Sequence, residues 1–250
     1  MLSRVLSEDR LVGGRVRLRQ PLYGFRTAID PVLLAAAVPV EAGEAVLEAG
    51  LGTGAAALAL LARVPEARVV GIERDAELAE IARANAGLNA AEDRLAVLCG
   101  DLADRTTQRA AASLGPFRHA MANPPFFRGG TAPPDPLRRA AAHEEAEAPL
   151  SLWVSVLARR LLPRGTLTLI LPPERLAEAL AACAATGVGS VVLFPLWPRA
   201  GQPARRLIMQ GVKGGRAPLR LSAGLVLHEG DGFTDEAQAV LRDGDALRLG

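Results

Sequence analysis

The stretch that decides the fold is Val46-Leu47-Glu48-Ala49-Gly50-Leu51-Gly52-Thr53-Gly54. Its apolar start is typical of a buried strand, and the alternating glycines that follow are typical of a tight turn into a helix. Glycines at such a junction let a ligand approach the backbone closely, and the N–H groups of the next helix point toward the same place. We therefore expect a nucleotide-type cofactor at this turn.

Short aliphatic runs and alanine-rich runs alternate around the turn, from about residue 44 to residue 171. This alternation is typical of βαβ units around a parallel sheet. We expect strands at 45–47, 67–73, 95–99, 117–122 and 166–171, and helices at 53–63, 75–87, 106–113, 150–162 and 174–185. Later apolar runs between Pro/Gly-rich turns predict strands at 190–196, 206–212 and 219–228, which would close one edge of the sheet in an antiparallel manner.

The first 40 residues differ from this pattern. They predict a hairpin around Gly13-Gly14 and an apolar helix from Pro31 to Val38. We expect residues 1–40 to pack as a small extension on one main domain, residues 41–250. Residues 129–136 are rich in Gly and Pro and predict a loop, which is either a lid over a substrate or a plain surface connector.

Composition and charge restrict the class of protein. The chain has 250 residues, half of them apolar, which suffices for one α/β core, and a formal net charge of +2 that says little about partners. Cys99 and Cys183 form no Cys-x-x-Cys pair, and the three histidines lack metal-ligand spacing, so we expect no disulfide framework and no metal. The chain shows no signal-peptide pattern and no apolar run of about twenty residues, which predicts a soluble cytoplasmic protein without a membrane span. The oligomeric state stays open.

Carboxylates stand near the ends of the next two predicted strands. Glu73 ends the second strand, about twenty residues after the turn, where a carboxylate can accept both hydroxyls of a ribose. Asp101 follows the third strand and could accept from an adenine amino group, while Leu102 could pack on the ring. Helix capping is the competing interpretation of both acids.

The run Asn123-Pro124-Pro125-Phe126 ends the fourth predicted strand, about 70 residues after the turn. The Asn side-chain oxygen and a proline carbonyl can both accept hydrogen bonds from one planar amino group, because neither proline has a competing N–H. Phe126 offers a ring on which a flat target such as a nucleobase can stack. Since open α/β sheets bind ligands at the carboxyl ends of their strands, this run and the glycine turn should meet.

These residues resemble a known family, the class I S-adenosylmethionine (SAM)-dependent methyltransferases that act on exocyclic amino groups. The likeness rests on Glu48-x-Gly50-x-Gly52-x-Gly54 and on Asn123 to Phe126. The chain is more closely similar to the bacterial valine-tRNA (adenine-N6)-methyltransferases, which modify an adenine beside the anticodon. That closer likeness rests on Phe25 to Leu34, Asn123 to Phe127, His143-Glu144 and Pro195 to Gly201 running into Arg205-Arg206.

The resemblance implies a Rossmann-like fold with a mostly parallel seven-stranded sheet, SAM as cofactor and the N6 amino group of an RNA adenine as acceptor. It implies that Asn123 and the Pro124 carbonyl hold the amine in line with the cofactor's methyl group, without a strong general base. The expected catalytic residues are Asn123, Pro124, Pro125 and Phe126. The expected cofactor-binding residues are Asp30, Glu48, Gly50, Gly52, Gly54, Glu73, Arg74, Asp101 and Leu102. For Asp30, helix capping before Pro31 is an equally simple explanation.

A basic segment predicts contact with nucleic acid. No acidic residue lies between Glu178 and Glu229, and the interval carries Arg199, Arg205, Arg206 and Lys213, interleaved with Phe194 and Trp197. Such a face can bind phosphates. Arg138, Arg139 and the N-terminal Arg15, Arg17, Arg19 and Arg26 could extend it. The alternative is ordinary solvated charge on edge strands.

Other functions stay open at this point. A glutamine side-chain amide in a protein, or an adenine in ribosomal RNA, also fits the Asn-Pro-Pro-aromatic run. Gly50, Gly52 and Ala55 satisfy the looser G-x-G-x-x-A dinucleotide pattern, so a nicotinamide-dependent oxidoreductase would explain the turn but not Asn123 to Phe126. A non-catalytic RNA-binding protein on the same fold is a further alternative.

Overall fold

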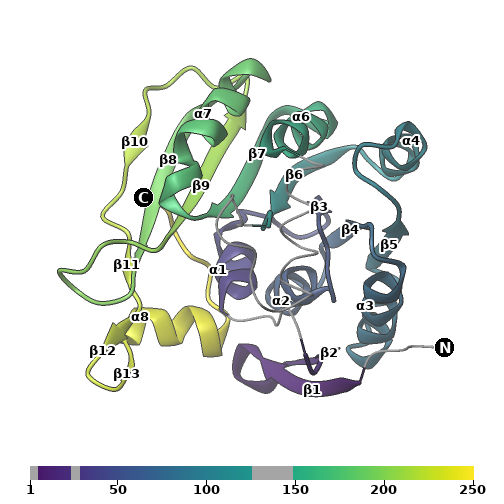
Figure 1. Ribbon diagram of the computed structural model, residues 1–250, viewed down its shortest axis with the longest axis horizontal. Helices are drawn as coiled ribbons and strands as arrows, with labels where there is room; N and C mark the ends of the chain where they lie inside the picture. Colours follow the sequence, from purple (N-terminus) through teal and green to yellow (C-terminus); the bar gives the residue numbers. More distant parts are fainter. Residues whose placement is uncertain (1–4, 24–28, 126–148) are drawn as a thin grey trace.

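A computed structural model describes residues 5–23, 29–125 and 149–250 (Figure 1). Its central sheet has the strand order β5-β4-β3-β6-β7-β9-β8, extended by two short strands beside β8. The parallel strands are β3 (Ala45–Ala49), β4 (Arg68–Glu73), β5 (Leu95–Cys99), β6 (Phe117–Ala122) and β7 (Leu161–Leu171). β9 (Arg206–Lys213) runs antiparallel between β7 and β8 (Val188–Trp197). The expected α/β architecture, a mostly parallel sheet with an antiparallel edge, is confirmed.

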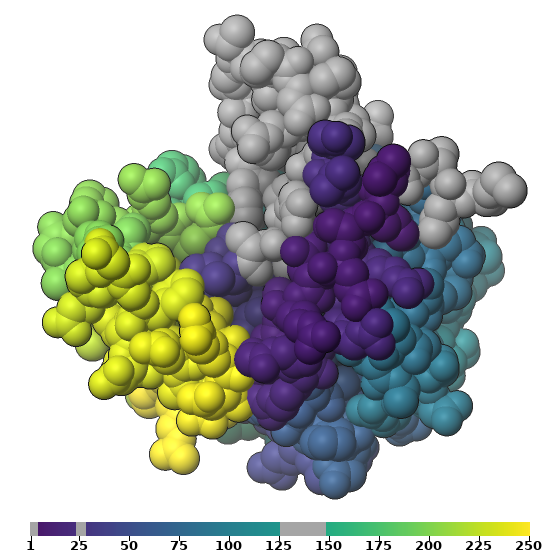
Figure 2. Space-filling model, turned by 90° about the horizontal axis from the view of Figure 1, so that it is seen from below, coloured from purple at the N-terminus to yellow at the C-terminus, as the bar shows by residue number. Residues whose placement is uncertain are grey.

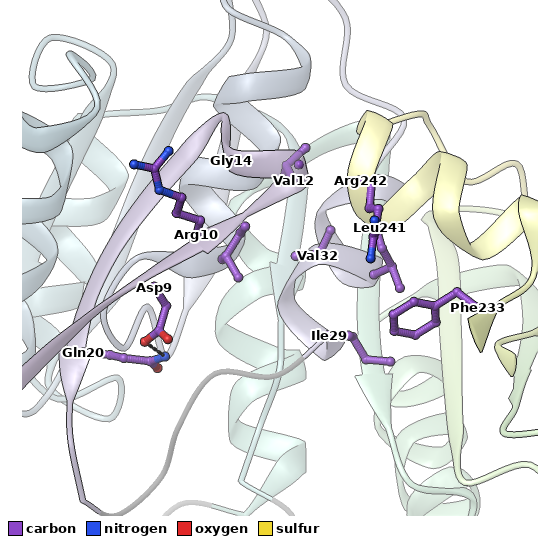
Figure 3. Close-up of a pocket in the computed structure, with 12 residues that line it drawn as sticks. Asp9, Arg10, Val12, Gly14, Gln20, Ile29, Val32, Phe233, Leu241 and Arg242 are labelled. Atoms are coloured by element: carbon purple, nitrogen blue, oxygen red, sulfur yellow. Dashed lines mark hydrogen bonds between the residues drawn. The ribbon is translucent and has the colours of Figure 1, made fainter. Parts of the chain in front are cut away.

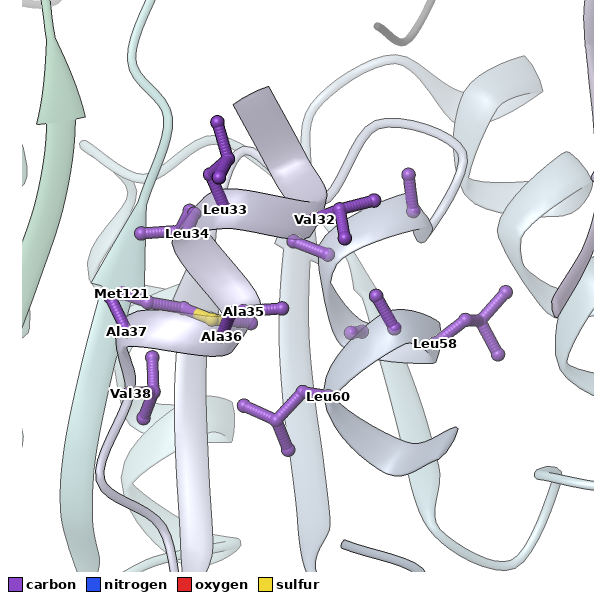
Figure 4. Packing of buried hydrophobic residues seen from close by; sticks show 14 of the residues in the cluster. Val32, Leu33, Leu34, Ala35, Ala36, Ala37, Val38, Leu58, Leu60 and Met121 are labelled. Carbon is purple, nitrogen blue, oxygen red and sulfur yellow. The ribbon is translucent and has the colours of Figure 1, made fainter. Parts of the chain in front are cut away.

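Helices cover both faces of the sheet (Figure 1). On one face lie α1 (Asp30–Ala37), α2 (Ala55–Arg63) and α3 (Ala76–Leu88), and on the other α4 (Arg105–Ser113), α6 (Leu150–Arg160) and α7 (Leu176–Ala185). The strands supply both cores because successive side chains point to opposite faces: Val46 packs with the first group, and Leu47 with the second. Figure 4 shows Met121 of β6 beside Ala36 and Ala37 of α1, in the same hydrophobic cluster as Leu60 of α2.

The N-terminal hairpin is confirmed. β1 (Leu6–Leu11) and β2 (Val16–Pro21) pair antiparallel around a 3₁₀ turn, Val12–Gly14, in which Gly13 and Gly14 have φ of 62° and 95°. Asn85 of α3 and Asn89, the C-cap of α3, fix the hairpin to the domain. Asn85 accepts from and donates to the backbone of Arg19, and Asn89 does the same with Arg17. The division at residue 40 stays a prediction.

The structure differs from the expected elements in two places. The strand expected at 219–228 is two short strands, β10 (Arg220–Leu221) and β11 (Leu225–Val226), which pair parallel to β8. Gly224, at φ 84°, turns the chain between them. β7 begins at Leu161 rather than at residue 166, and a bulge that includes Arg164 at φ 65° shifts its register with β6.

The C-terminal segment returns to the first face. It contains β12 (His228–Glu229), β13 (Gly232–Phe233), α8 (Asp235–Gln238) and a π-helical turn, Ala239–Asp243 (η3). Leu247 N–H donates to the Ala36 carbonyl at 2.8 Å, which ties this segment to the end of α1. No helix in the described part of the chain is both long and apolar enough to cross a membrane.

Candidate active site

The carboxyl ends of four parallel strands lie side by side, and we call this end of the sheet the carboxyl edge. Ala49 pairs with Ile72 and with Ala122, and Glu73 pairs with Cys99, so β3, β4, β5 and β6 reach this edge in register. The segments that follow them carry the glycine turn, Asp101 and Asn123. The sheet therefore brings the predicted cofactor and target residues to one edge, as expected for an open α/β sheet.

The glycine turn is fixed from behind and open in front. Gly50 N–H and Leu51 N–H both donate to the Ile72 carbonyl, at 2.9 and 3.0 Å, and Gly50, Gly52 and Gly54 all have left-handed φ, between 58° and 87°. A Cβ at Gly52 would meet no atom within 4 Å, whereas a Cβ at Gly50 would lie 2.7 Å from the Trp153 ring. A ligand can thus approach Gly52, while Trp153 of α6 covers Gly50. Sequence reasoning missed Trp153 because nothing in its own segment points to the turn.

Glu48 is a buried carboxyl group behind the turn. It is 3% exposed, and its Oε2 has no hydrogen-bond partner among the described residues. Burial, and then the nearby charge of Glu73, raise the pKa of Glu48 well above its ordinary value, and a hydrogen bond from the Ala57 backbone partly opposes this. An unsatisfied buried acceptor of this kind favours a cationic or hydrogen-bond-donating ligand group.

Glu73 is held by the backbone on both sides. Its Oε2 accepts from Gly52 N–H at 2.7 Å and its Oε1 accepts from Asp75 N–H at 2.9 Å. The N-cap of α3 is Asp75, whose side chain accepts from Glu77 N–H and Leu78 N–H. Glu73 is therefore not the N-cap of α3, and its carboxylate lies directly beside the glycine turn.

The third strand end shows the same arrangement. Asp101 accepts from Ala103 N–H at 2.7 Å, and Arg74 Nη1 lies 3.8 Å from its Oδ2. Asp104, not Asp101, caps α4 by accepting from Thr106 N–H. Leu102 is buried beside it. An acidic and an apolar group thus stand at the strand end where the sequence places the adenine contact.

Asn123 carries the second unsatisfied acceptor of the edge. Its Oδ1 is buried and has no hydrogen-bond partner among the described residues. The carbonyl of Pro125 accepts from Arg175 Nη1 at 2.8 Å, and Arg175, which is 4% exposed, also pairs with Glu178 at 3.3 Å. Arg175 follows the end of β7 at the same edge. Its position shortly after a predicted strand is the one feature of the sequence that could have indicated this residue. Phe126 lies outside the described residues.

Asp30 and Arg206 form an ion pair across the edge. Arg206 Nε donates to Asp30 Oδ2 at 2.8 Å, which joins the start of β9 to the start of α1. A residue expected to bind cofactor and one expected to bind nucleic acid are therefore partners. Arg205 beside them is exposed.

The remaining basic residues do not all gather here. Arg199 lies just beyond the end of β8 and donates from Nη1 to the Gly230 carbonyl at 2.6 Å. Lys213 ends β9 at the opposite edge of the sheet, where its Nζ donates to the Thr186 carbonyl. Phe194 is buried in the core, and the Trp197 indole N–H donates to the Ala223 carbonyl. The edge that carries the site thus holds Arg199, Arg205 and Arg206.

His119 lies in β6, toward the amino ends of the parallel strands and away from the candidate site. Its ring nitrogens contact Glu44 Oε2 at 2.8 Å and Thr166 Oγ1 at 2.7 Å, and burial lowers its pKa. Among the described residues, no group of three or more His, Cys, Asp or Glu side chains could hold a metal ion. The predictions for 25–28, 126–127, the 129–136 loop, Arg138, Arg139 and His143-Glu144 fall outside the described residues.

Comparisons with known proteins point to methyltransferases. A family model described as a methyltransferase domain matches residues 46–122, from the strand before the glycine turn to the strand before Asn123. A protein of Porphyromonas gingivalis named tRNA1(Val) (adenine(37)-N6)-methyltransferase is 39% identical over 158 residues, covering 62% of this chain and 61% of its own length. A protein of Aeromonas hydrophila with the same name is 30% identical over 210 residues, covering 83% of this chain and 84% of its own. The matched region thus spans about three fifths of the Porphyromonas relative.

Solved structures agree on the fold. One described as a predicted O-methyltransferase from Agrobacterium tumefaciens is 31% identical, with a TM-score of 0.69 over 84% of this chain and 94% of that chain. A SAM-dependent O-methyltransferase from Thermotoga maritima is 15% identical with a TM-score of 0.51, over 78% of this chain and 69% of that one, which shows the fold alone. The chain therefore belongs to the methyltransferase family of these relatives and has the class I methyltransferase fold.

Proposed function

We propose that the protein transfers a methyl group from SAM to the N6 amino group of an adenine in RNA, and that the RNA is a tRNA modified near its anticodon. The observation that carries the proposal is the buried Asn123 Oδ1, an acceptor without a partner among the described residues at the edge that also holds the glycine turn. An unsatisfied buried acceptor costs free energy, and an amino group is the donor that would satisfy it.

The residues of the turn fit SAM. Gly52 leaves open space in front of the backbone. The Glu73 carboxylate accepts from Gly52 N–H in this structure, and it would accept ribose hydroxyls once the cofactor is bound. The unsatisfied Glu48 Oε2 supports a cationic ligand. Asp101 and Leu102 would hold the adenine, Arg74 lies 3.8 Å from Asp101, and Asp30 would contribute from the start of α1. The chemistry that this cofactor supplies is an electrophilic methyl group on a sulfonium.

The Asn-Pro-Pro segment supplies orientation rather than proton transfer. Asn123 Oδ1 and the Pro124 carbonyl would accept the two amino hydrogens, which turns the nitrogen lone pair out of conjugation with the ring and toward the methyl donor. Holding the nucleophile in this geometry removes much of the entropic cost of the reaction. The two acceptors also stabilise the positive charge that develops on the nitrogen, and its proton leaves after transfer.

An RNA acceptor is supported by the names of the two relatives and by Arg199, Arg205 and Arg206 at this edge. Arginine forks bind phosphates, and an adenine in a tRNA loop is extruded at a lower cost than one in a duplex. Lys213 lies at the opposite end of the sheet, so it would contact only RNA phosphates that are distant from the methylated adenine. The name of the Agrobacterium structure offers an O-methyl acceptor as a second candidate, and the product identifies which acceptor is used.

The test is transfer of a labelled methyl group from SAM to bulk bacterial tRNA, followed by nucleoside analysis. Labelled N6-methyladenosine that disappears in Asn123→Ala is the expected result, while binding of SAM by the variant stays near that of the wild type. A labelled 2′-O-methyl nucleoside would replace the proposal with the O-methyl candidate. SAM binding without transfer to tRNA would overturn the tRNA assignment, and ribosomal RNA and protein glutamine would be assayed next. Binding of NADH instead of SAM would overturn the whole proposal.

A further inference from the structure

A pocket of about 630 Å³ lies beside the site, between the N-terminal hairpin and the C-terminal segment. Figure 2 shows these two segments, purple and yellow, side by side on one face of the molecule. The start of α1 lies between them, and Ile29 and Val32 line the pocket there (Figure 3). The pocket thus joins the N-terminal hairpin and the start of α1 to a C-terminal segment that is far away in the sequence.

The two walls of the pocket are fixed to each other at one end. Arg15 Nη2 donates to the Asp243 carbonyl, and Gly13 at φ 62° lies so close to η3 that a Cβ there would be 2.5 Å from the Arg242 carbonyl oxygen. Gly244 allows the same approach from the other side, because a Cβ there would overlap the Arg15 guanidinium. Two glycines thus permit a contact that holds hairpin and C-terminal segment at a defined separation.

The lining combines three kinds of chemistry (Figure 3). Ile29, Val32 and Leu241 make an apolar floor, next to the Phe233 ring, whose position is fixed by stacking on His228 at a centroid distance of 4.7 Å. At one end, the buried Gln20 donates from Nε2 to Asp9 Oδ2 at 2.8 Å. At the rim, Arg242 is exposed, while the Arg10 side chain points away from the cavity on the outer face of the hairpin.

The position of the pocket relates it to the proposed reaction. Ile29 immediately precedes Asp30, which pairs with Arg206 at the basic edge. Gln20 follows Arg19, whose backbone is joined through Asn85 to the Thr53 carbonyl in the glycine turn. The pocket is therefore connected, through one neighbouring residue on each side, to the basic edge and to the glycine turn.

We propose that this pocket binds one unpaired nucleotide of the RNA substrate, adjacent to the methylated adenine, with its base on the apolar floor beside Phe233 and its phosphate at Arg242. The inference rests on the proposed function. A volume of this size is within the roughly 300–1,000 Å³ of sites that bind small molecules, and a nucleotide fits it. Carboxylate and amide groups hydrogen-bond to base edges, arginines bind phosphates, and aromatic rings stack on bases.

The test measures binding of a fluorescein-labelled anticodon stem-loop RNA to three full-length variants. Arg242→Ala should reduce the slope of log affinity against log salt by about 1, because one phosphate contact is lost. Phe233→Leu should weaken binding about 5–10-fold at constant salt, the lower end of the cost of a lost base–aromatic contact. The matched control removes one exposed arginine from α4 on the opposite face, Arg109→Ala, and should change neither quantity.

Stem-loops that lack one base at a time locate the bound nucleotide. In the wild type, one loop position other than the target should lose about as much affinity as Phe233→Leu causes, and in Phe233→Leu the same missing base should cost nothing more. Unchanged affinity and salt slope in the pocket variants would overturn the inference. So would a thermal shift by adenosine 5′-monophosphate that the pocket variants abolish while RNA binding stays intact, because the site would then serve a free nucleotide. Methylation of RNA by the same wild-type preparation separates these outcomes from failure of the proposed function.

Discussion

The cofactor half and the target half of the carboxyl edge are built differently. The cofactor half, Gly50–Gly54 with Glu73 and Asp101, is held by its own backbone: both oxygens of Glu73 accept N–H groups from neighbouring turns. The proposed target half, Asn123–Pro125, has a side-chain acceptor without a partner among the described residues and is held from outside by Arg175. One half is therefore preformed by local geometry, and the other depends on a distant contact and on its ligand.

The largest effect should come from the unsatisfied acceptor of the target half. Asn123→Ala removes one of two acceptors for the amino group, and loss of a single such polar contact in a transition state costs about 10²–10³-fold in turnover. Affinity for SAM should stay within about twofold, since the two halves are separate. Single-turnover methylation and equilibrium binding of SAM measure the two quantities.

Asn123→Asp is the matched control for that variant, because it keeps an acceptor oxygen in the same place. It should retain more activity than Asn123→Ala. If both variants lost SAM binding in parallel with turnover, the proposed separation of the two halves would be wrong.

The glycine turn should respond in stability as well as in binding. Gly50→Ala forces an L side chain into left-handed backbone and against the Trp153 ring, so we expect a loss of about 2–4 kcal/mol in the free energy of unfolding. Gly52→Ala has the strained backbone but open space, and should cost about 1 kcal/mol while weakening SAM binding. Urea unfolding and SAM titration of the two variants check the contrast, which equal losses of stability would contradict.

Local signals explain how much of this arrangement the sequence could predict. The glycine turn, the hairpin around Gly13-Gly14 and the order of strands and helices follow from residue preferences within a few positions. Arg175 and Pro125 are 50 residues apart, and Asp30 and Arg206 are 176 apart, so these contacts exist only once the topology is known. The same reason hid Trp153 and the pocket. A single glycine, Gly224, was enough to divide a predicted strand into two.

Arg175 tests whether the target half is held from outside. Arg175→Met removes the donor to the Pro125 carbonyl, and we expect turnover to fall about 10-fold with little change in SAM affinity, because a misplaced Asn-Pro-Pro segment orients the amine poorly. Arg175→Lys should recover part of the turnover. Glu178→Gln keeps the hydrogen bond between Arg175 and Pro125 and weakens only the ion pair, so this variant should retain most of the wild-type turnover.

A loss of turnover in Arg175→Met that merely followed a loss of folded protein would assign Arg175 a structural role alone. Thermal unfolding of each variant, measured beside the rate, separates the two roles. The pH profile of turnover should keep its shape, since Arg175 takes no part in proton transfer.

The smallest effect concerns Glu48, whose Oε2 is a buried acceptor without a partner among the described residues. Because burial raises its folded-state pKa above the unfolded value, the folded protein binds more protons than the unfolded chain between those two pKa values, and stability falls as pH rises through that interval. Glu48→Gln lacks this titration, so the variant should be more stable than the wild type at pH 8, and the difference should shrink steadily toward pH 5. The variant should also bind SAM more weakly, because a neutral amide attracts a cationic ligand less than a carboxyl group that can ionise beside it. Urea unfolding of both proteins across this pH range measures the first effect. A wild type that was instead more stable than the variant at pH 8, by a margin lost toward acid pH, would show that Glu48 is ionised and paired in the folded protein.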